Sequence, residues 1–368
     1  MKKVTVIGAG NGGMTAAYHF AKKGYEVCLY DFKKFDTQIK AIEANGGIEA
    51  LEEAHGCKMI LPGFEKNIHA TTDEKTAAEF ANMMVMVCPS FAQEILFSGL
   101  LEYIKDGQEI VIMPGNYGGL VLSKLVNEKR PELDLTFIDA ISIPWATRIE
   151  KPGVLTIMGI KEFIPMSIFP KSKANQSLVN RLNDVMPIPV EILANPLIAG
   201  LENINFGGHP LITTVNIGLL ENFDGNFNYY HDCCSHATAN ACKILDKERL
   251  AVGESFGYKL RTELEAMNAL YASNYETVYD FNRASVTHGK VNKGPNSSKA
   301  RYITEDIPYL FVPCYEFAKL AGIKTPIIES IINLANAYNE TNYYESGRTL
   351  EKMGLNGLTI DEIKKRLS

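Results

Sequence analysis

The chain has 368 residues, a net charge of -6, and 46% hydrophobic against 22% charged residues. These values are typical of a globular protein with a sizeable core and two, or at most three, domains. A mildly acidic chain lacks the basic surface that would bind nucleic acids or anionic membranes. No apolar run approaches the roughly 18 residues that cross a bilayer, and the N-terminus lacks a signal-peptide pattern. We therefore expect a cytoplasmic protein that binds neither nucleic acid nor membrane.

The cysteines are odd in number and irregularly spaced, which argues against a disulfide framework and fits a reducing compartment. They are Cys28, Cys57, Cys88, Cys233, Cys234, Cys242 and Cys314.

Residues 2–31 predict one strand–helix–strand unit. An apolar strand at 2–7 runs into a glycine-rich turn, a helical stretch follows and closes at Gly24, and a second strand ends at Asp31. Strands at 68–73, 81–90, 108–115, 135–141, 154–161 and 189–193 then alternate with helices at 76–81, 91–107 and 118–130. Such alternation predicts an α/β Rossmann-type, doubly wound sheet with helices on both of its faces.

The second half has a different texture. Long segments such as 241–257 and 312–323 carry apolar residues at a spacing of three to four, and few alternating β-branched runs occur. This pattern predicts an all-α C-terminal domain. We place the boundary near Ala194, with a dinucleotide-binding domain at 1–194 and a helical domain at 195–368.

The turn after the first strand carries a dinucleotide-binding signature. Gly8, Gly10 and Gly13 have the G-x-G-x-x-G spacing, and Asn11 and Gly12 complete the loop. The first glycine permits the tight turn, the second lets the backbone approach a pyrophosphate, and the third lets helix and strand pack closely. The helix N-terminus then offers its N–H groups to the phosphates.

Asp31 ends the second strand, where a carboxylate can bind ribose hydroxyls and repel a 2′-phosphate. We therefore expect NAD rather than NADP, although Lys33 and Lys34 follow closely and carry the opposite charge. FAD is the rival cofactor for the same fingerprint, and the helical second half makes it the less favoured one.

Three residues of the second half suit a reaction on a carbonyl or an imine. His209 stands between Gly208 and Pro210, which favour a local break that exposes the imidazole. Arg301 can grip a carboxylate with two parallel hydrogen bonds, and Asp306 can orient an imidazole and stabilise its protonated form. Taken alone, a structural histidine explains His209 at least as well, and a surface ion pair at the start of a helix is the favoured interpretation of Arg301 and Asp306.

In combination, these segments resemble the opine dehydrogenases, the octopine/nopaline dehydrogenase group. The likeness extends over nearly the whole chain, in the family's order, through GAGNGG, MPGNYGG, ISIPWATR, NINFGGHP, LDKERLAVGESFG, RYITEDIPY and GRTLEKMGLNGLT.

The resemblance implies a Rossmann domain and a helical domain with the active site in the cleft between them. It also implies that an α-keto acid, often pyruvate, condenses with the amino group of an amino acid and that NADH or NADPH reduces the imine. By position, His209 corresponds to the acid/base, Arg301 to the arginine that binds the substrate carboxylate, and Asp306 to the partner of the histidine.

Further candidates follow predicted strand ends, where doubly wound folds place ligands. Pro89 and Ser90 are candidates for cofactor contacts. Asn116 and Arg148 are candidates for substrate contacts, and a structural surface role for Arg148 is equally favoured.

A cluster of histidines and cysteines at 231–242 invites a zinc interpretation, but its spacing fits no standard ligand set, and we expect no metal. Its members are His231, Cys233, Cys234, His236 and Cys242.

Two other functions stay open. One is another two-domain dehydrogenase of the 2- or 3-hydroxyacid type, and the other is a protein that senses NAD without catalysis. The amino substrate is also open, from glycine, alanine, arginine or taurine to a larger amine that would yield a metal chelator, because motifs do not encode pocket shape. Beyond these small molecules, the favoured partner is a second copy of the chain in a homodimer.

Overall fold

The structure is a computed structural model that describes residues 2–285 and 294–368. Its internal contacts divide the chain into two compact units, Met1–Pro196 and Leu197–Ser368.

The first unit is built on an eight-stranded mixed sheet in the order β14-β13-β10-β9-β8-β1-β2-β7. β13 pairs antiparallel with β10 and parallel with β14, while the other pairs are parallel. The strands are β1 (Lys3–Ile7), β2 (Glu26–Tyr30), β7 (Ile68–Thr71), β8 (Met83–Met86), β9 (Glu109–Ile112), β10 (Thr136–Ala140), β13 (Ile164–Phe169) and β14 (Val190–Leu193).

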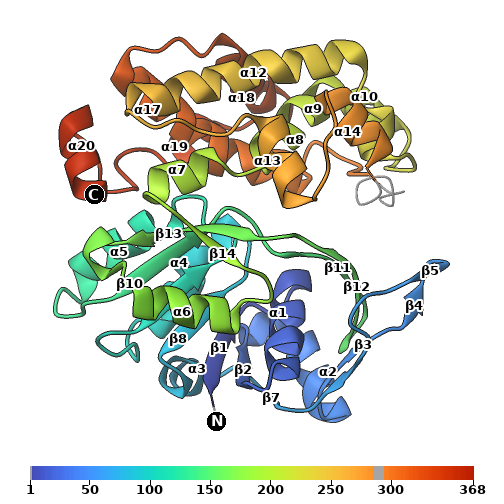
Figure 1. The fold of residues 1–368 in the computed structure, drawn as a ribbon, viewed down its shortest axis with the longest axis vertical. Coiled ribbons are helices and arrows are strands. Elements are labelled where there is room, and N and C mark those ends of the chain that lie inside the picture. Colours follow the sequence, from blue (N-terminus) through green and yellow to red (C-terminus); the bar gives the residue numbers. More distant parts are fainter. Residues whose placement is uncertain (1, 286–293) are drawn as a thin grey trace. The chain divides into compact units, whose positions relative to one another are not determined.

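Helices cover both faces of this sheet (Figure 1). Apolar side chains of α3 (Glu74–Phe80), α4 (Ser90–Leu100) and α5 (Gly118–Lys129) form one buried core with the strands. α1 (Asn11–Lys22) and α6 (Gln176–Val185) lie on the opposite face, and α2 (Thr37–Asn45) contacts β7. Short 3₁₀ turns span η1 (Lys33–Phe35) and η2 (Lys171–Lys173). The predicted Rossmann-type architecture is confirmed.

One predicted strand belongs to a different sheet. The segment expected at 154–161 forms β12 (Val154–Ile160), which lies in a second, four-stranded sheet in the order β11-β12-β3-β6. β12 turns back antiparallel on β11 (Trp145–Lys151) through Gly153, whose φ is +78°. β3 (Ile48–Ala50) and β6 (Gly63–Glu65) complete this sheet, which contacts α1. The tight hairpin gives β12 a nearer partner than any strand of the main sheet.

A two-stranded ribbon of β4 (Glu53–Ala54) and β5 (Cys57–Lys58) extends from the same unit (Figure 1). All seven cysteines are free thiols, and six are buried, whereas Cys57 in this ribbon is exposed.

The described residues of the second unit form helices joined by loops, with no strand among them, as predicted. The long α12 (His236–Ser255) contacts α9, α14, α17 and α18. The other helices are α7 (Pro196–Leu201), α8 (Asn205–Gly208), α9 (Pro210–Val215), α10 (Ile217–Asn222), α11 (Tyr229–Asp232), α13 (Glu263–Leu270), α14 (Val278–Ala284), α16 (Arg301–Thr304), the π-helical turn η3 (Ile307–Phe311), α17 (Val312–Ala321), α18 (Pro326–Asn339), α19 (Tyr343–Ser346) and α20 (Ile360–Leu367).

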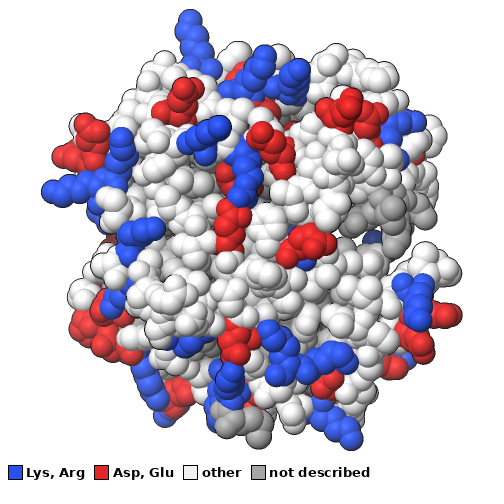
Figure 2. Space-filling view, viewed as in Figure 1, with Lys and Arg blue, Asp and Glu red and all other residues white. Residues whose placement is uncertain are grey.

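Basic and acidic side chains are interspersed over the face seen in Figure 2, rather than gathered by sign. Among the described residues, none of the helices combines the length and the apolar character that a membrane crossing needs.

Candidate active site

The glycine-rich loop joins β1 to α1 at the carboxyl edge of the sheet. Gly8 has a φ of +101°, and its N–H donates to the Tyr30 carbonyl at 2.8 Å. A Cβ at Gly13 would lie 1.7 Å from the Gly8 carbonyl oxygen, so only glycine permits this approach of helix and strand. A Cβ at Gly10 would meet nothing within 4 Å. The first and third glycines therefore serve the turn and the packing, and the second leaves open space beside the start of α1.

Asp31 is tied to the same loop. Its Oδ2 accepts the Ala9 N–H and its Oδ1 accepts the Phe32 N–H, both at 2.8 Å. Partial burial raises the pKa of Asp31, and the two backbone hydrogen bonds oppose that rise. The carboxylate thus stands at the loop, with lone pairs to spare for a further donor. Lys33 and Lys34 are both exposed.

The Asn11 side chain links this loop to the second sheet, because its Oδ1 accepts the Ile149 N–H of β11 at 2.6 Å. Thr15 of α1 adds a second link through its hydroxyl, 2.6 Å from that of Thr147. Gly12 also faces close packing, since a Cβ there would lie 2.7 Å from a methyl carbon of Val87.

Two more candidates meet where β8 and β9 end. The Asn116 Nδ2 donates to the Ser90 Oγ at 2.8 Å, and both side chains are buried. Pro89 caps the start of α4, and Asn116 adopts a left-handed φ of +49°. Arg148, by contrast, lies within β11 of the second sheet, paired with Thr156, and its side chain is exposed. The expectation that Arg148 follows a strand is therefore wrong, because the residue belongs to the hairpin itself.

His209 sits at the junction of α8 and α9 in the second unit. Pro210 occupies the first turn of α9, and His209 itself has non-helical angles, with φ -121° and ψ -66°. The Nδ1 of His209 lies 2.7 Å from Oδ2 of Asp306, which is 97 residues away in the chain. The Nε2 lies 3.2 Å from the hydroxyl of Tyr230. The break between the helices thus presents both ring nitrogens to partners.

Asp306 immediately precedes the π-helical turn and is almost completely buried. Burial raises the pKa of Asp306, and the hydrogen bond to His209 opposes that rise. Arg301 lies five residues before Asp306 and pairs instead with Glu305, to which its Nε donates at 2.6 Å. Most of the Arg301 side chain is exposed, whereas that of Glu305 is buried. The arginine therefore presents an accessible guanidinium anchored at one side by a carboxylate.

Tyrosines enclose the histidine. Tyr302 stacks on His209 with ring centroids 3.7 Å apart and planes 4° from parallel. The Tyr229 hydroxyl donates to the His209 carbonyl at 3.1 Å and lies 2.8 Å from the Thr213 hydroxyl. Burial raises the pKa values of Tyr229 and Tyr230 well above the ordinary value, so both phenols stay protonated.

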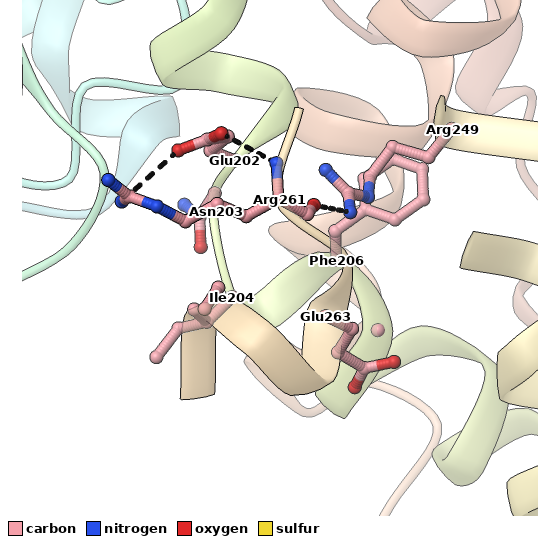
Figure 3. Close-up of a pocket in the computed structure, with 9 residues that line it drawn as sticks. Glu202, Asn203, Ile204, Phe206, Arg249, Arg261 and Glu263 are labelled. Atoms are coloured by element: carbon pink, nitrogen blue, oxygen red, sulfur yellow. Dashed lines mark hydrogen bonds and ion pairs between the residues drawn. The ribbon is translucent and has the colours of Figure 1, made fainter. Parts of the chain in front are cut away.

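Charged residues and residues of α8 together line a small cavity (Figure 3). Glu202 accepts the Arg261 backbone N–H at 3.0 Å, and the Arg249 guanidinium donates to the Arg261 carbonyl at 2.6 Å. Glu263 points away from these arginines in Figure 3, and among the described residues neither of its carboxylate oxygens has a hydrogen-bond partner. Burial, with the charge of Asp246 next in effect, raises the pKa of Glu263 to about 8.

Glu263 also explains a glycine of the NINFGGHP motif. A Cβ at Gly207 would lie 2.1 Å from the Glu263 carboxyl carbon. The acid packs directly on α8, two residues before His209, so a side chain at residue 207 would have to displace the Glu263 carboxylate.

The histidines and cysteines at 231–242 have separate partners. His231 contacts Asp232 at 2.7 Å, and His236 stacks on Tyr279. Cys242 donates weakly to the Gly207 carbonyl at 3.9 Å. Within residues 2–285 and 294–368, no three side chains of the metal-ligating types come together.

Two family models match the chain. Residues 192–339 match the alpha-helical domain of NAD/NADP octopine/nopaline dehydrogenase, and residues 3–130 match the N-terminus of NAD-dependent glycerol-3-phosphate dehydrogenase. An opine dehydrogenase of Arthrobacter sp. (strain 1C) is 29% identical over 364 residues, which cover 99% of this chain and 98% of the relative. The chain is therefore similar to opine dehydrogenases over its whole length, and residues 192–339 match the helical domain of that family.

Other opine dehydrogenases agree over most of their length. Octopine dehydrogenase of Mizuhopecten yessoensis is 24% identical over 367 residues, covering 90% of this chain and 89% of that protein. Among solved structures, octopine dehydrogenase in complex with NADH and agmatine has a TM-score of 0.79 at 20% identity, with 100% of this chain and 99% of that chain covered. A structure of octopine dehydrogenase with NADH and pyruvate has a TM-score of 0.76 at 20% identity, over 99% of this chain and 98% of that chain. The chain therefore has the same fold as octopine dehydrogenase.

Several residues around His209 could not be predicted from the sequence. Tyr229, Tyr230 and Glu263 carry no motif, because tyrosines and glutamates are common in helical segments of any function. Tyr302 stands inside RYITEDIPY, next to Arg301, and its place in that motif was the one available signal.

Proposed function

We propose that this chain is an opine dehydrogenase that joins an α-keto acid, with pyruvate as the first candidate, to the amino group of an amino acid. The product is a secondary amine that carries two carboxylates. The observation that carries the proposal is the buried His209–Asp306 pair, with 2.7 Å between Nδ1 and Oδ2, inside the helical domain that matches the octopine/nopaline family. Burying a carboxylate costs free energy, and a histidine that only fills space does not require one as its partner. The buried pair therefore favours a functional role for His209.

NAD is the proposed cofactor, and its reduced form, NADH, would supply the hydride that reduces the imine. The pyrophosphate would lie against Gly10 and the start of α1, which has no side-chain cap and so leaves N–H groups to bind phosphate. Asp31 would accept the ribose hydroxyls and repel the additional phosphate of NADP. The other proposed cofactor contacts are Gly8, Asn11, Gly12, Gly13, Pro89 and Ser90. Tighter binding of NADPH than of NADH in a fluorescence titration would overturn this preference.

His209 is the proposed acid/base. The ionised form of Asp306 accepts the Nδ1–H and so leaves Nε2 as the nitrogen that exchanges protons with the substrate. Protonated His209 assists loss of water from the carbinolamine, and the negative charge of Asp306 stabilises the imidazolium. Neutral imidazole remains after the step.

Arg301 is proposed to bind the keto-acid carboxylate. Its guanidinium has five N–H donors, and the pair with Glu305 uses those on one edge, so the other edge can form two parallel hydrogen bonds to a substrate. Asn116 and Arg148 are proposed as further substrate contacts. In this scheme residues 1–194 bind the cofactor and supply Asn116 and Arg148 to the substrates. Residues 195–368 supply Arg301 and perform the proton chemistry, and no metal takes part.

A hydroxyacid-type dehydrogenase is the second candidate. It is favoured by the match of residues 3–130 to the N-terminus of NAD-dependent glycerol-3-phosphate dehydrogenase. That match covers the cofactor-binding half, which such enzymes share with opine dehydrogenases, and the match at 192–339 favours the opine reaction. We further propose a cytoplasmic location and a homodimer.

The deciding experiment follows NADH absorbance with pyruvate and a panel of amino acids, including glycine, alanine, arginine and taurine. Controls omit the amine or the keto acid. Turnover only when both are present supports reductive condensation, and the best amine defines the product. Turnover with the keto acid alone would instead establish a hydroxyacid dehydrogenase, and tight NADH binding without turnover would favour an NAD sensor.

A further inference from the structure

The two nitrogens of His209 face different partners. Nδ1 meets the buried carboxylate of Asp306, so the proton on this side is committed to an ionic hydrogen bond. Nε2 is the nitrogen through which the ring exchanges protons with a substrate, and the Tyr230 hydroxyl lies on it at 3.2 Å. Any proton that leaves Nε2 along this direction meets a phenol oxygen first.

Tyr230 is suited to receive and to pass on a proton. Burial raises the pKa of Tyr230 well above the ordinary value, so the side chain is a neutral hydroxyl, which is both a donor and an acceptor. The Tyr302 side chain also hydrogen-bonds with Tyr230, and Tyr302 stacks on the imidazole. Ring and hydroxyl are thereby held in register, as a proton transfer between them requires.

We propose that the Tyr230 hydroxyl carries the proton between His209 Nε2 and the oxygen that leaves the substrate. The inference rests on the proposed function and adds a residue to it. As the C–O bond of the carbinolamine breaks, the Tyr230 O–H proton passes to the departing oxygen and the imidazolium Nε2 proton passes to the Tyr230 oxygen. Water leaves, the nitrogen lone pair forms the C=N bond, and the positive charge passes from the imidazolium to the protonated imine, so that neutral imidazole and neutral tyrosine remain.

The neighbouring tyrosine has a different task, which provides a matched control. Tyr229 precedes Tyr230 in α11, but its hydroxyl donates to the main-chain carbonyls of Gly208 and His209, at 3.3 and 3.1 Å. Its ring meets the imidazole edge-on, with centroids 6.4 Å apart. Tyr229 therefore holds the backbone of the histidine, whereas Tyr230 contacts the reacting nitrogen.

The test compares Tyr230→Phe with Tyr229→Phe in the condensation assay, run in mixtures of H₂O and D₂O. For Tyr230→Phe we expect kcat to fall by about 10- to 100-fold, with the KM for the keto acid nearly unchanged. The dependence of kcat on deuterium fraction should be curved in the wild type, where two protons move together, and linear in Tyr230→Phe. Tyr229→Phe should lower the Tm and keep the curved dependence. A Tyr230→Phe enzyme with near wild-type kcat and a curved dependence overturns the proposal.

Failure of the proposed function would be visible separately, as a wild-type enzyme that turns over no pair of substrates. In that case the ¹⁵N resonances of the His209 ring decide whether Tyr230 is bonded to Nε2 at all. A changed Nε2 resonance in Tyr230→Phe, with Nδ1 unchanged, supports the hydrogen bond on which the relay depends. Identical ring spectra in the two proteins overturn it.

Discussion

The imidazole of His209 and the phenol ring of Tyr302 lie face to face, with their planes 4° from parallel and their centroids 3.7 Å apart. This stack prevents rotation of the imidazole about its own bond to the chain. Rotation would take Nδ1 away from Asp306 and Nε2 away from Tyr230 at the same time, so the stack maintains both hydrogen bonds.

The first prediction follows from this stack. Tyr302→Leu should lower kcat/KM about tenfold, or about 1.4 kcal/mol of transition-state stabilisation, because the imidazole loses its preferred plane. Tyr302→Phe retains the ring and should lose much less. Steady-state kinetics of the two variants provide the measurement, and equal losses in both would show that the hydroxyl matters rather than the stack.

Asp306→Asn should be more damaging. The amide has no charge to stabilise an imidazolium, and its NH₂ group favours the tautomer with the proton on Nε2. We expect kcat to fall at least about 100-fold, with the affinity for NADH unchanged because Asp306 belongs to the helical unit. A variant within threefold of wild type would contradict the proposed role of the pair.

Gly13 and Gly10 should respond differently to alanine. A Cβ at residue 13 would lie 1.7 Å from the Gly8 carbonyl oxygen, so Gly13→Ala should lower the free energy of unfolding by about 2–3 kcal/mol, measured by urea denaturation without cofactor. A Cβ at residue 10 meets nothing within 4 Å, so Gly10→Ala should unfold like the wild type but bind NADH more weakly. Unchanged NADH affinity in Gly10→Ala would place the pyrophosphate elsewhere.

The pH dependence of stability should reveal Glu263. Its pKa is raised from 4.5 to about 8 in the folded state, so the folded protein binds one more proton than the unfolded chain between these pH values. Stability attributable to this group is therefore full at low pH and declines by up to about 1.4 kcal/mol per pH unit as the pH rises towards 8. Glu263→Gln removes the titration, so its unfolding free energy should depend less steeply on pH. Parallel curves for the two proteins would indicate that Glu263 is ionised in the fold.

Seven of the eight strands of the first sheet were predictable because their signals are local, whereas β13 (Ile164–Phe169) was not predicted. Each buried strand is a short apolar run, each helix has its own period, and the turn at Gly8 needs a glycine. The second sheet was not predictable in this way. An apolar run such as Val154–Ile160 looks the same whichever sheet it joins, and its antiparallel partner, Trp145–Lys151, is rich in polar residues.

For the site, motifs identified His209 and Asp306, which the fold brings to hydrogen-bonding distance across 97 residues. Arg301 pairs with Glu305, four residues on, a spacing that brings opposite charges together on a helix. The contacts of Tyr230 and Glu263 depend on how several helices pack together, and no local pattern records that packing.

The exposed position of Cys57 makes the chain suitable for labelling without any substitution. The other six cysteines are buried, and burial raises the thiol pKa of at least five of them, so a maleimide dye should react at Cys57 first. The β4–β5 ribbon that carries it is made by a segment of the first unit distant in sequence from His209 and Asp306. A fluorophore there would follow the first unit in single-molecule measurements while the proton chemistry of the second proceeds undisturbed.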